Sequence, residues 1–143
     1  MTIATKILVP TDLGDAAEHA LDYALELARG TGGRVYLLHV VPLPAGGFSE
    51  LGALSREAEA RLLEAHQRAV NALAEPRGAV AMLVRRGDPR DAIPEAAEGL
   101  DADLIVIATH GRRAISRLLL GSVAESVVRT APCPVLTVRP PKR

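Results

Sequence analysis

Short runs of consecutive aliphatic residues alternate along the chain with longer segments in which apolar residues recur at three- and four-residue steps. An unbroken aliphatic run suits a strand buried on both faces, and the longer spacing is typical of an amphipathic helix. The pattern predicts strands at residues 6–10, 34–41, 79–84, 104–108 and 135–138, and helices at residues 15–29, 50–74, 91–99 and 122–130. Because strand and helix alternate with short links, we predict an α/β fold, an open five-stranded parallel sheet with helices on both faces and a Rossmann-like architecture.

Two helices carry further detail. A proline deep inside a helix breaks it, whereas one in the first turn is tolerated, so Pro94 predicts a helix that begins near Asp91, which can cap it. The helix at residues 50–74 has an apolar stripe made of Leu51, Leu54, Ala58, Leu62, Ala65, Ala69 and Leu73. Its charged residues lie mostly off that stripe, which is typical of a solvated face.

Composition and charge narrow the classes of function. The 143 residues are 48% hydrophobic and carry equal numbers of basic and acidic side chains, 17 each, with no Trp. A neutral chain with few aromatic rings lacks the usual features of a nucleic-acid binder, so we expect no nucleic-acid partner. No apolar run reaches membrane-spanning length, and the first residues lack a signal-peptide core, so we expect a soluble cytoplasmic protein with one domain over residues 1–143 and no membrane partner.

Cys133 is the single cysteine, which excludes an internal disulfide and a multi-cysteine zinc site. It lies between Pro132 and Pro134. We interpret it as a small buried thiol in a rigid connection and not as a reactive nucleophile.

The candidate site lies where the winding of the sheet reverses. In open parallel sheets, ligands bind beyond the carboxyl ends of the strands at that point. We predict the strand order 3-2-1-4-5, which makes the first and fourth strands neighbours there. Their carboxyl ends carry Pro10-Thr11-Asp12 and Ala108-Thr109-His110-Gly111, so two polar loops are expected to meet at one crevice.

The second of these loops has the layout of a phosphate site. Gly111 and Gly121 are separated by nine residues, and Ser122 opens the next helix. Glycine lets a phosphate approach the backbone, and the free amides of Val123 and Ala124 at the helix start add donors. Each residue also has a purely structural interpretation: Gly111 as a turn glycine, and Ser122 as the first member of an S-x-x-E capping box.

The spacing resembles the universal stress protein family, whose nucleotide-binding members carry Gly-x2-Gly-x9-Gly-(Ser/Thr) after the fourth strand. Further segments look like the family in the family's order: residues 6–12, 37–41, 87–89, 117–125 and 131–136. The resemblance therefore covers the whole chain. It implies a single universal stress protein domain with an adenine nucleotide alpha hydrolase-like fold.

The resemblance also implies an adenine nucleotide in the crevice, usually ATP, with ADP or AMP as alternatives and Mg²⁺ as a potential companion ion. By position, the adenosine part would meet Pro10, Thr11, Asp12 and Val40, with Val40 on the adenine. Gly111, Arg112 and Arg113 would wrap the phosphates, and Gly121, Ser122 and Val123 would close from the other side. Ala108 and His110 are counted in the same nucleotide site.

Several of these residues have a second interpretation. The Asp12 carboxylate can accept from a ribose hydroxyl, or it can cap the first helix through a local turn. Arg112 and Arg113 can grip phosphate oxygens or stay as solvated loop charges. Ala108 departs from the family glycine, and its methyl group would crowd the ligand or require a backbone angle that alanine dislikes. A second departure is Leu13-Gly14, which removes a hydroxyl donor often seen after the aspartate.

The histidines give no strong catalytic signal. His110 can act as a base, but a loop histidine bonded to the backbone is the more common arrangement. We expect His39 to be a satisfied core group, and His19 and His66 to be exposed. No Asp, Glu or His cluster has metal-ligand spacing, and no Walker lysine or nucleophile elbow is present, so no catalytic residue is assigned.

Three functions remain open. The leading hypothesis is an ATP-binding universal stress protein with a regulatory role in the stress response and little or no turnover. The alternatives are a slow ATPase and a nucleotide-free dimeric assembly module. The resemblance implies a homodimer, and the short apolar strand at residues 135–138, at a sheet edge, suits pairing between subunits.

Overall fold

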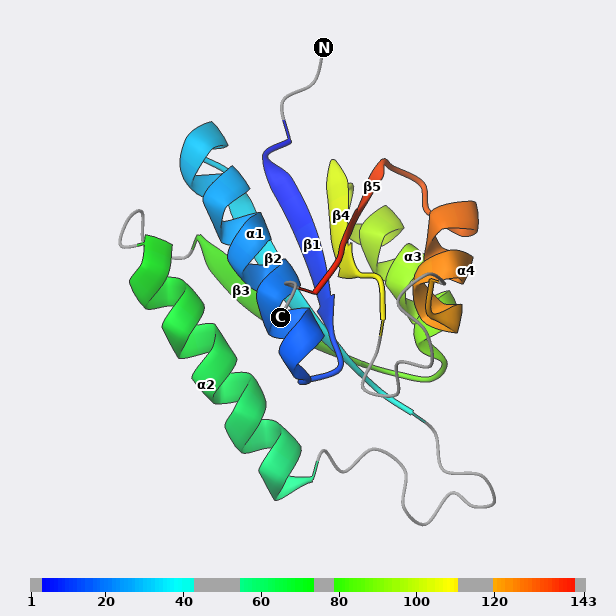
Figure 1. The fold of residues 1–143 in the computed structure, drawn as a ribbon, viewed down its shortest axis with the longest axis horizontal. Coiled ribbons are helices and arrows are strands. Elements are labelled where there is room, and N and C mark those ends of the chain that lie inside the picture. The colour runs from blue at the N-terminus through cyan, green and yellow to red at the C-terminus, as the bar shows by residue number, and fades with distance from the viewer. Residues whose placement is uncertain (1–3, 43–54, 74–78, 111–119, 141–143) are drawn as a thin grey trace.

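The computed structural model describes residues 4–42, 55–73, 79–110 and 120–140. The elements in these ranges are β1 (Lys6–Thr11), α1 (Asp15–Thr31), β2 (Arg34–Val41), α2 (Arg56–Leu73), β3 (Val80–Arg86), α3 (Pro89–Leu100), β4 (Leu104–Ala108), α4 (Ser122–Thr130) and β5 (Val135–Val138). The strands form one parallel sheet in the order β3-β2-β1-β4-β5 (Figure 1). The predicted strand order and fold class are confirmed.

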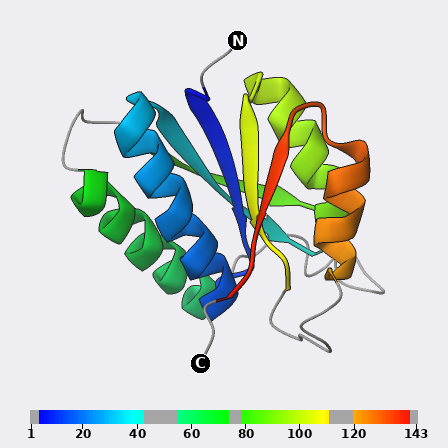
Figure 2. The ribbon, with the colours of Figure 1, turned by 45° about the horizontal axis from the view of Figure 1, so that its top comes forward.

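The sheet separates two apolar layers. Helices α1 and α2 cover one face and α3 and α4 cover the other (Figure 2). Successive side chains of a strand point to opposite faces, so Ile7 and Val9 join the layer under α1 and α2, while Leu8 joins the layer under α3 and α4. The apolar positions predicted for α1 are all buried: Ala17, Ala20, Leu21, Ala24, Leu25 and Ala28.

The starts of two helices differ from the predictions. Helix α3 begins at Pro89, not near Asp91, because the Asp88 side chain accepts the Arg90 amide at 2.9 Å and caps the helix. Pro89 needs no amide partner at that first position, and the helix continues through Pro94 despite the hydrogen bond that this proline cannot donate.

Helix α2 begins at Arg56, because Ser55 is not helical and its hydroxyl accepts the Ala58 amide at 3.1 Å. The predicted start near Glu50 is therefore wrong. The stripe residues Leu51 and Leu54 lie outside the described residues.

Helix α4 has Gly121 as its N-cap and Ser122 as its first helical residue. In a capping box the serine itself is the N-cap, so that interpretation of Ser122 and Glu125 is wrong. The Glu125 carboxylate instead accepts from Arg129 at 2.9 Å, one turn along the helix.

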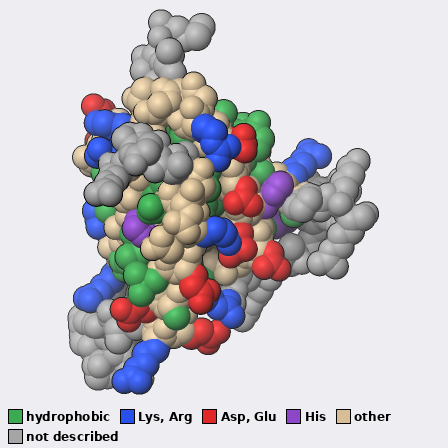
Figure 3. All heavy atoms as spheres, turned by 90° about the vertical axis from the view of Figure 1, so that its left-hand side faces the viewer, with side chains coloured by type: hydrophobic (Ala, Val, Ile, Leu, Met, Phe, Trp, Pro, Cys, Tyr) green, Lys and Arg blue, Asp and Glu red, His purple; other side chains and the backbone are tan. Residues whose placement is uncertain are grey.

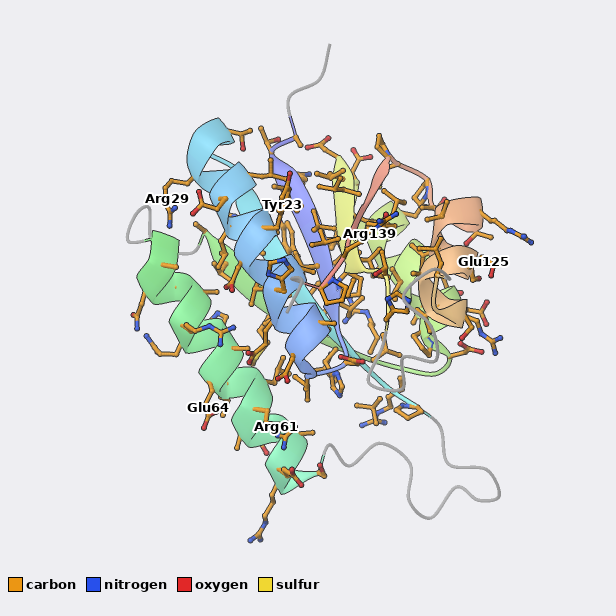
Figure 4. The ribbon with its side chains drawn as sticks, viewed as in Figure 1. Tyr23, Arg29, Arg61, Glu64, Glu125 and Arg139 are labelled. Atoms are coloured by element: carbon orange, nitrogen blue, oxygen red, sulfur yellow. The ribbon has the colours of Figure 1, made fainter. Side chains whose placement is uncertain are left out.

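The outer faces of the helices are charged and mixed in sign. On the side of α1 and α2, acidic and basic side chains are interspersed (Figure 3). Arg61 and Glu64 extend outward from α2, and Glu125 extends from α4 (Figure 4). In the described ranges, no helix is both long enough and apolar enough to cross a membrane.

Candidate functional site

A pocket of about 600 Å³ lies at the carboxyl edge of the sheet, where β1 and β4 are neighbours. In Figure 1 this is the lower edge, toward which the arrowheads of β1 and β4 point. The pocket brings together nine of the twelve residues that the sequence nominated: Pro10, Thr11, Asp12, Val40, Ala108, His110, Gly121, Ser122 and Val123. The other three, Gly111, Arg112 and Arg113, lie outside the described residues.

The pocket wall contains further residues that the sequence did not nominate. Most are apolar, and several belong to the first turns of helices that begin at this edge: Ala17, Leu38, Pro42, Ala58, Pro89, Ile93 and Ile107. Every helix of a parallel α/β sheet starts near the carboxyl end of a strand. The apolar wall could therefore have been predicted in part from the sequence, from the apolar residues in the first turns of the helices.

The loop after β1 is a tight turn held by its own side chains. The Leu13 amide donates to Thr11 Oγ1 at 3.0 Å, and the Gly14 amide donates to Asp12 Oδ1 at 2.9 Å. Gly14 is the N-cap of α1, and its carbonyl accepts the Glu18 amide at 3.1 Å. Asp12 therefore has the local-turn role considered from the sequence, although Gly14 and not Asp12 occupies the cap position.

The loop after β4 starts from a buried polar pair. Thr109 and His110 are 4% and 7% exposed, and Thr109 Oγ1 lies 2.9 Å from His110 Nδ1. His110 Nε2 is buried and has no hydrogen-bond partner among the described residues. Within the described residues, His110 therefore pairs with the Thr109 side chain and not, as was expected, with the backbone.

Backbone hydrogen bonds fix both ends of this loop against the sheet. The Thr109 amide donates to Val138 O of β5 at 3.0 Å, and the Gly121 amide donates to Thr109 O at 2.6 Å. The start of α4 is therefore tied directly to the end of β4. As a result, Ser122, Val123 and Ala124 line the same pocket as the start of the β4 loop.

Ala108 ends β4 in the register Ala108↔Val138 and is half-buried at the pocket. Its φ does not lie in the left-handed region. In the described ranges, the non-glycine residues in that region are Leu13 and Asp101. The expectation that Ala108 would need a backbone angle that alanine dislikes is therefore wrong. The remaining consequence is steric, because the methyl group occupies space at the pocket.

The helix starts at this edge of the sheet supply backbone donors of the kind that suit an anion. The four helices of the described ranges begin near this edge (Figure 1), and the amides of a first turn together with the helix dipole give each start a partial positive charge. At the start of α3, Arg90 bonds Asp88 with its side chain and its backbone amide and lowers the pKa of that carboxyl. A phosphate group is the kind of ligand that such an edge accommodates.

The remaining histidines and the cysteine differ in part from the expectations. His39 is a satisfied group as expected, because its Nδ1 donates to Thr11 O at 2.9 Å, but it also lines the pocket. His19 is half-buried and not exposed. His66 is also half-buried, because its ring reaches the edge strand and Nε2 donates to Val80 O at 3.1 Å. Cys133 is half-buried, and burial raises the pKa of its thiol.

No group of three or more His, Cys, Asp or Glu side chains suited to a metal ion occurs within the described ranges. Asp12 carries the charged side chain among the pocket-lining residues that the structure describes. The described part of the pocket combines apolar walls, a carboxylate and first-turn amides, which suits the binding of a small molecule.

Comparison with known sequences agrees with this geometry. A model of the universal stress protein family matches residues 4–139. A universal stress protein of Methanocaldococcus jannaschii is 38% identical over an alignment that covers 96% of this chain and 84% of the relative. A universal stress protein of Thermus aquaticus is 37% identical, with 93% and 97% covered.

Solved structures share the fold. The universal stress protein UspA from Lactobacillus plantarum superposes with a TM-score of 0.80 at 28% identity, covering 97% of this chain and all of that one. A universal stress protein in complex with cAMP gives 0.72 at 27% identity, with 96% and 98% covered. A universal stress protein from Archaeoglobus fulgidus in complex with dAMP gives 0.64 at 32% identity, with 95% and 98% covered. With the family model spanning residues 4–139, the chain belongs to the universal stress protein family.

Proposed function

We propose that this pocket binds an adenine nucleotide, with ATP as the first choice, and that the protein is a regulatory stress-response protein with little or no turnover. The main support is the convergence of the β1 loop, the β4 loop and the first turn of α4 on one pocket of about 600 Å³. The complexes of similar proteins with cAMP and dAMP support the choice of an adenine nucleotide.

The adenine is assigned to the wall made by the end of β2 and the start of α3. Even-numbered residues of β2 turn their backbone groups toward β1, as the bond from the Arg34 amide to Thr5 O shows. The register with β1 ends at Thr11↔His39, so the Val40 carbonyl faces the space beyond β1. A carbonyl there can accept from the amino group of adenine, while Ile93 packs against the ring.

The ribose is assigned to Asp12. A carboxylate has about four acceptor positions. Asp12 can therefore hold the Gly14 amide at 2.9 Å and also accept from a ribose hydroxyl.

The phosphates are assigned to the start of α4. The first-turn amides have no partner inside the helix, and Ser122, Val123 and Ala124 all line the pocket. Gly111, Arg112 and Arg113 are proposed to complete the phosphate site. A bound nucleotide would change the surface that this edge offers to a partner protein, which is the proposed regulatory output.

Calorimetric titration with ATP, ADP and AMP at micromolar protein tests the binding. Ser122→Glu places a negative charge where the phosphates are assigned, and a carboxylate in a first helical turn does not harm the helix. We expect at least about a tenfold loss of ATP affinity, which corresponds to about 1.4 kcal/mol. Ser126→Glu, one turn further along α4 and outside the pocket, is the matched control. The absence of saturable heat with all three nucleotides would rule out the proposal.

Slow ATP hydrolysis is the second candidate, and His110 is the residue that favours it. Its Nε2 is without a partner among the described residues, next to the assigned phosphate site. A general base needs such a nitrogen within reach of the attacking water. Phosphate release that disappears in His110→Ala, with ATP binding retained, would support turnover. Release at the level of a buffer blank in the unaltered protein would exclude it.

The homodimer is proposed to form through β5. The Pro134 carbonyl accepts the Ile105 amide of β4, and the Val138 carbonyl accepts the Thr109 amide just after β4. The backbone groups of the odd-numbered Val135 and Thr137 therefore point to the other side of the strand. Thr137→Pro removes an outward donor without touching the β4 ladder. We expect a dimer in sedimentation experiments and a monomer for Thr137→Pro; a monomer at high concentration for the unaltered protein would contradict the proposal.

A further inference from the structure

The backbone at Leu13 is unusual. Its φ is +67°, in the left-handed region that leucine seldom adopts. The other non-glycine residue with positive φ in the described ranges is Asp101, at +56°, which is the C-cap of α3. Aspartate is one of the residues that tolerates this region, whereas leucine is not, so the conformation of Leu13 must be imposed by its surroundings.

The surroundings of Leu13 include both the core and the pocket. Its half-buried side chain packs against the apolar layer under α1 and α2 and also forms part of the pocket wall. Its amide donates to Thr11 Oγ1 at 3.0 Å, and the next amide, of Gly14, donates to Asp12 Oδ1 at 2.9 Å. The left-handed residue is therefore the centre of the turn that holds the Thr11 and Asp12 side chains at the pocket.

We propose that Leu13 is a positioning residue for the ligand. Packing of its side chain holds the turn in one conformation, so the Thr11 hydroxyl and the Asp12 carboxylate are fixed in place before the ribose of a nucleotide arrives. The inference rests on the proposed function of the pocket. Groups that are ordered in advance lose less freedom when the ligand binds, so removal of the packing lowers affinity in addition to any contact that the Leu13 side chain makes as part of the pocket wall.

Two substitutions separate this role from simple core filling. Leu13→Gly adopts the left-handed region without cost but releases the turn. Leu13→Asn also tolerates that region and replaces the apolar side chain, with its packing, by a polar one. Leu13→Met restores an apolar side chain of similar size and serves as the rescue. Leu27→Ala is the matched control, because Leu27 is half-buried against the same apolar layer and does not line the pocket.

The first readout is amide hydrogen exchange at Gly14 in the protein without nucleotide, and the second is the Kd for ATP. We expect Leu13→Gly and Leu13→Asn to exchange about tenfold faster at Gly14 and to bind ATP about fivefold more weakly. Leu13→Met should remain within about twofold of the unaltered protein in both readouts. Leu27→Ala should lower Tm and leave both readouts unchanged.

The two readouts also separate failure of this inference from failure of the proposed function. If both Leu13→Gly and Leu13→Asn keep the original exchange rate and Kd, the positioning role is overturned, even if Tm falls. If the unaltered protein binds no ATP, the proposed function fails, and exchange at Gly14 alone decides the role of Leu13. Faster exchange at Gly14 in both variants would then show that Leu13 holds the turn in place. Unchanged exchange would show that it does not.

Discussion

Asp103 fixes the start of β1 from the edge of the sheet opposite the pocket. Its Oδ2 accepts the Thr5 amide at 3.1 Å, the Thr5 hydroxyl at 3.0 Å and the Lys6 amide at 2.9 Å. The Asp103 amide in turn donates to Lys6 O at 2.9 Å. The backbone amides of Lys6 and Thr5, and then the Thr5 hydroxyl, lower the pKa of this carboxyl. Asp103→Asn should therefore destabilise the protein at neutral pH, because a neutral oxygen replaces a charged acceptor.

The magnitude follows from these three bonds. A hydrogen bond to a charged group contributes about 1.5–3 kcal/mol and a neutral one about 0.5–1.5 kcal/mol, so full burial would give a difference of about 1 kcal/mol for each bond. Asp103 is only half-buried, and solvent screens part of that difference. We expect a total loss of about 1–2 kcal/mol. For a domain of this size, that corresponds to a fall in Tm of about 3–6 °C.

The pH dependence has a definite sign. Because the folded state lowers the pKa of Asp103, its contribution is fully present above the unfolded pKa, about 3.9, and is lost as the pH falls through the lower folded pKa. Thermal or urea unfolding at pH 7 and at pH 3 should show a smaller gap between the two proteins in acid. Glu64→Gln, on the exposed outer face of α2 (Figure 4), is the control and should change the free energy of unfolding by less than about 0.5 kcal/mol. Equal stability at pH 7, or a gap that is as large at pH 3, would refute the reasoning.

Further predictions concern packing and thiol chemistry. Gly33→Ala would place a Cβ 3.0 Å from Thr5 O, so we expect a loss of about 1–3 kcal/mol in the free energy of unfolding. Gly30→Ala has open space around its new Cβ on a helix and should stabilise the protein by up to about 1 kcal/mol in the same urea titration, so equal effects at the two glycines would contradict the packing argument. Because burial raises the pKa of the Cys133 thiol, its reaction with a disulfide reagent at pH 8 should be slower in the folded than in the urea-unfolded protein, and equal rates would count against this environment.

The fold was largely predictable because its strongest signals are local. Uninterrupted aliphatic runs located the buried strands, and the order of strand and helix determined the parallel sheet. The start of α3 was missed because Pro94 was weighted as a boundary, whereas the cap made by Asp88 and the favourable position of Pro89 determine where the helix begins. Local capping outweighed a single missing backbone donor.

The site was predictable only in part. Thr11, Asp12 and Ala108 could be predicted as site residues from their places at strand ends, because the topology alone brings the ends of β1 and β4 together. No assignment was made for Ile93 from the sequence, because an apolar residue in a helical pattern carries no signal that separates a pocket wall from the core. The left-handed conformation of Leu13 was not predictable either, because leucine gives no local signal for positive φ and the conformation depends on packing across the fold.

Backbone amide NMR during a titration with ATP tests the central claim most directly, since it reports both whether the nucleotide binds and where. Saturable shifts should concentrate at residues 11–14, 40, 108–110 and 121–124, with little change at residues 5 and 103 on the opposite edge of the sheet. An absence of shifts at millimolar ATP, or saturable shifts that leave residues 11–14 and 121–124 unchanged, would contradict the account.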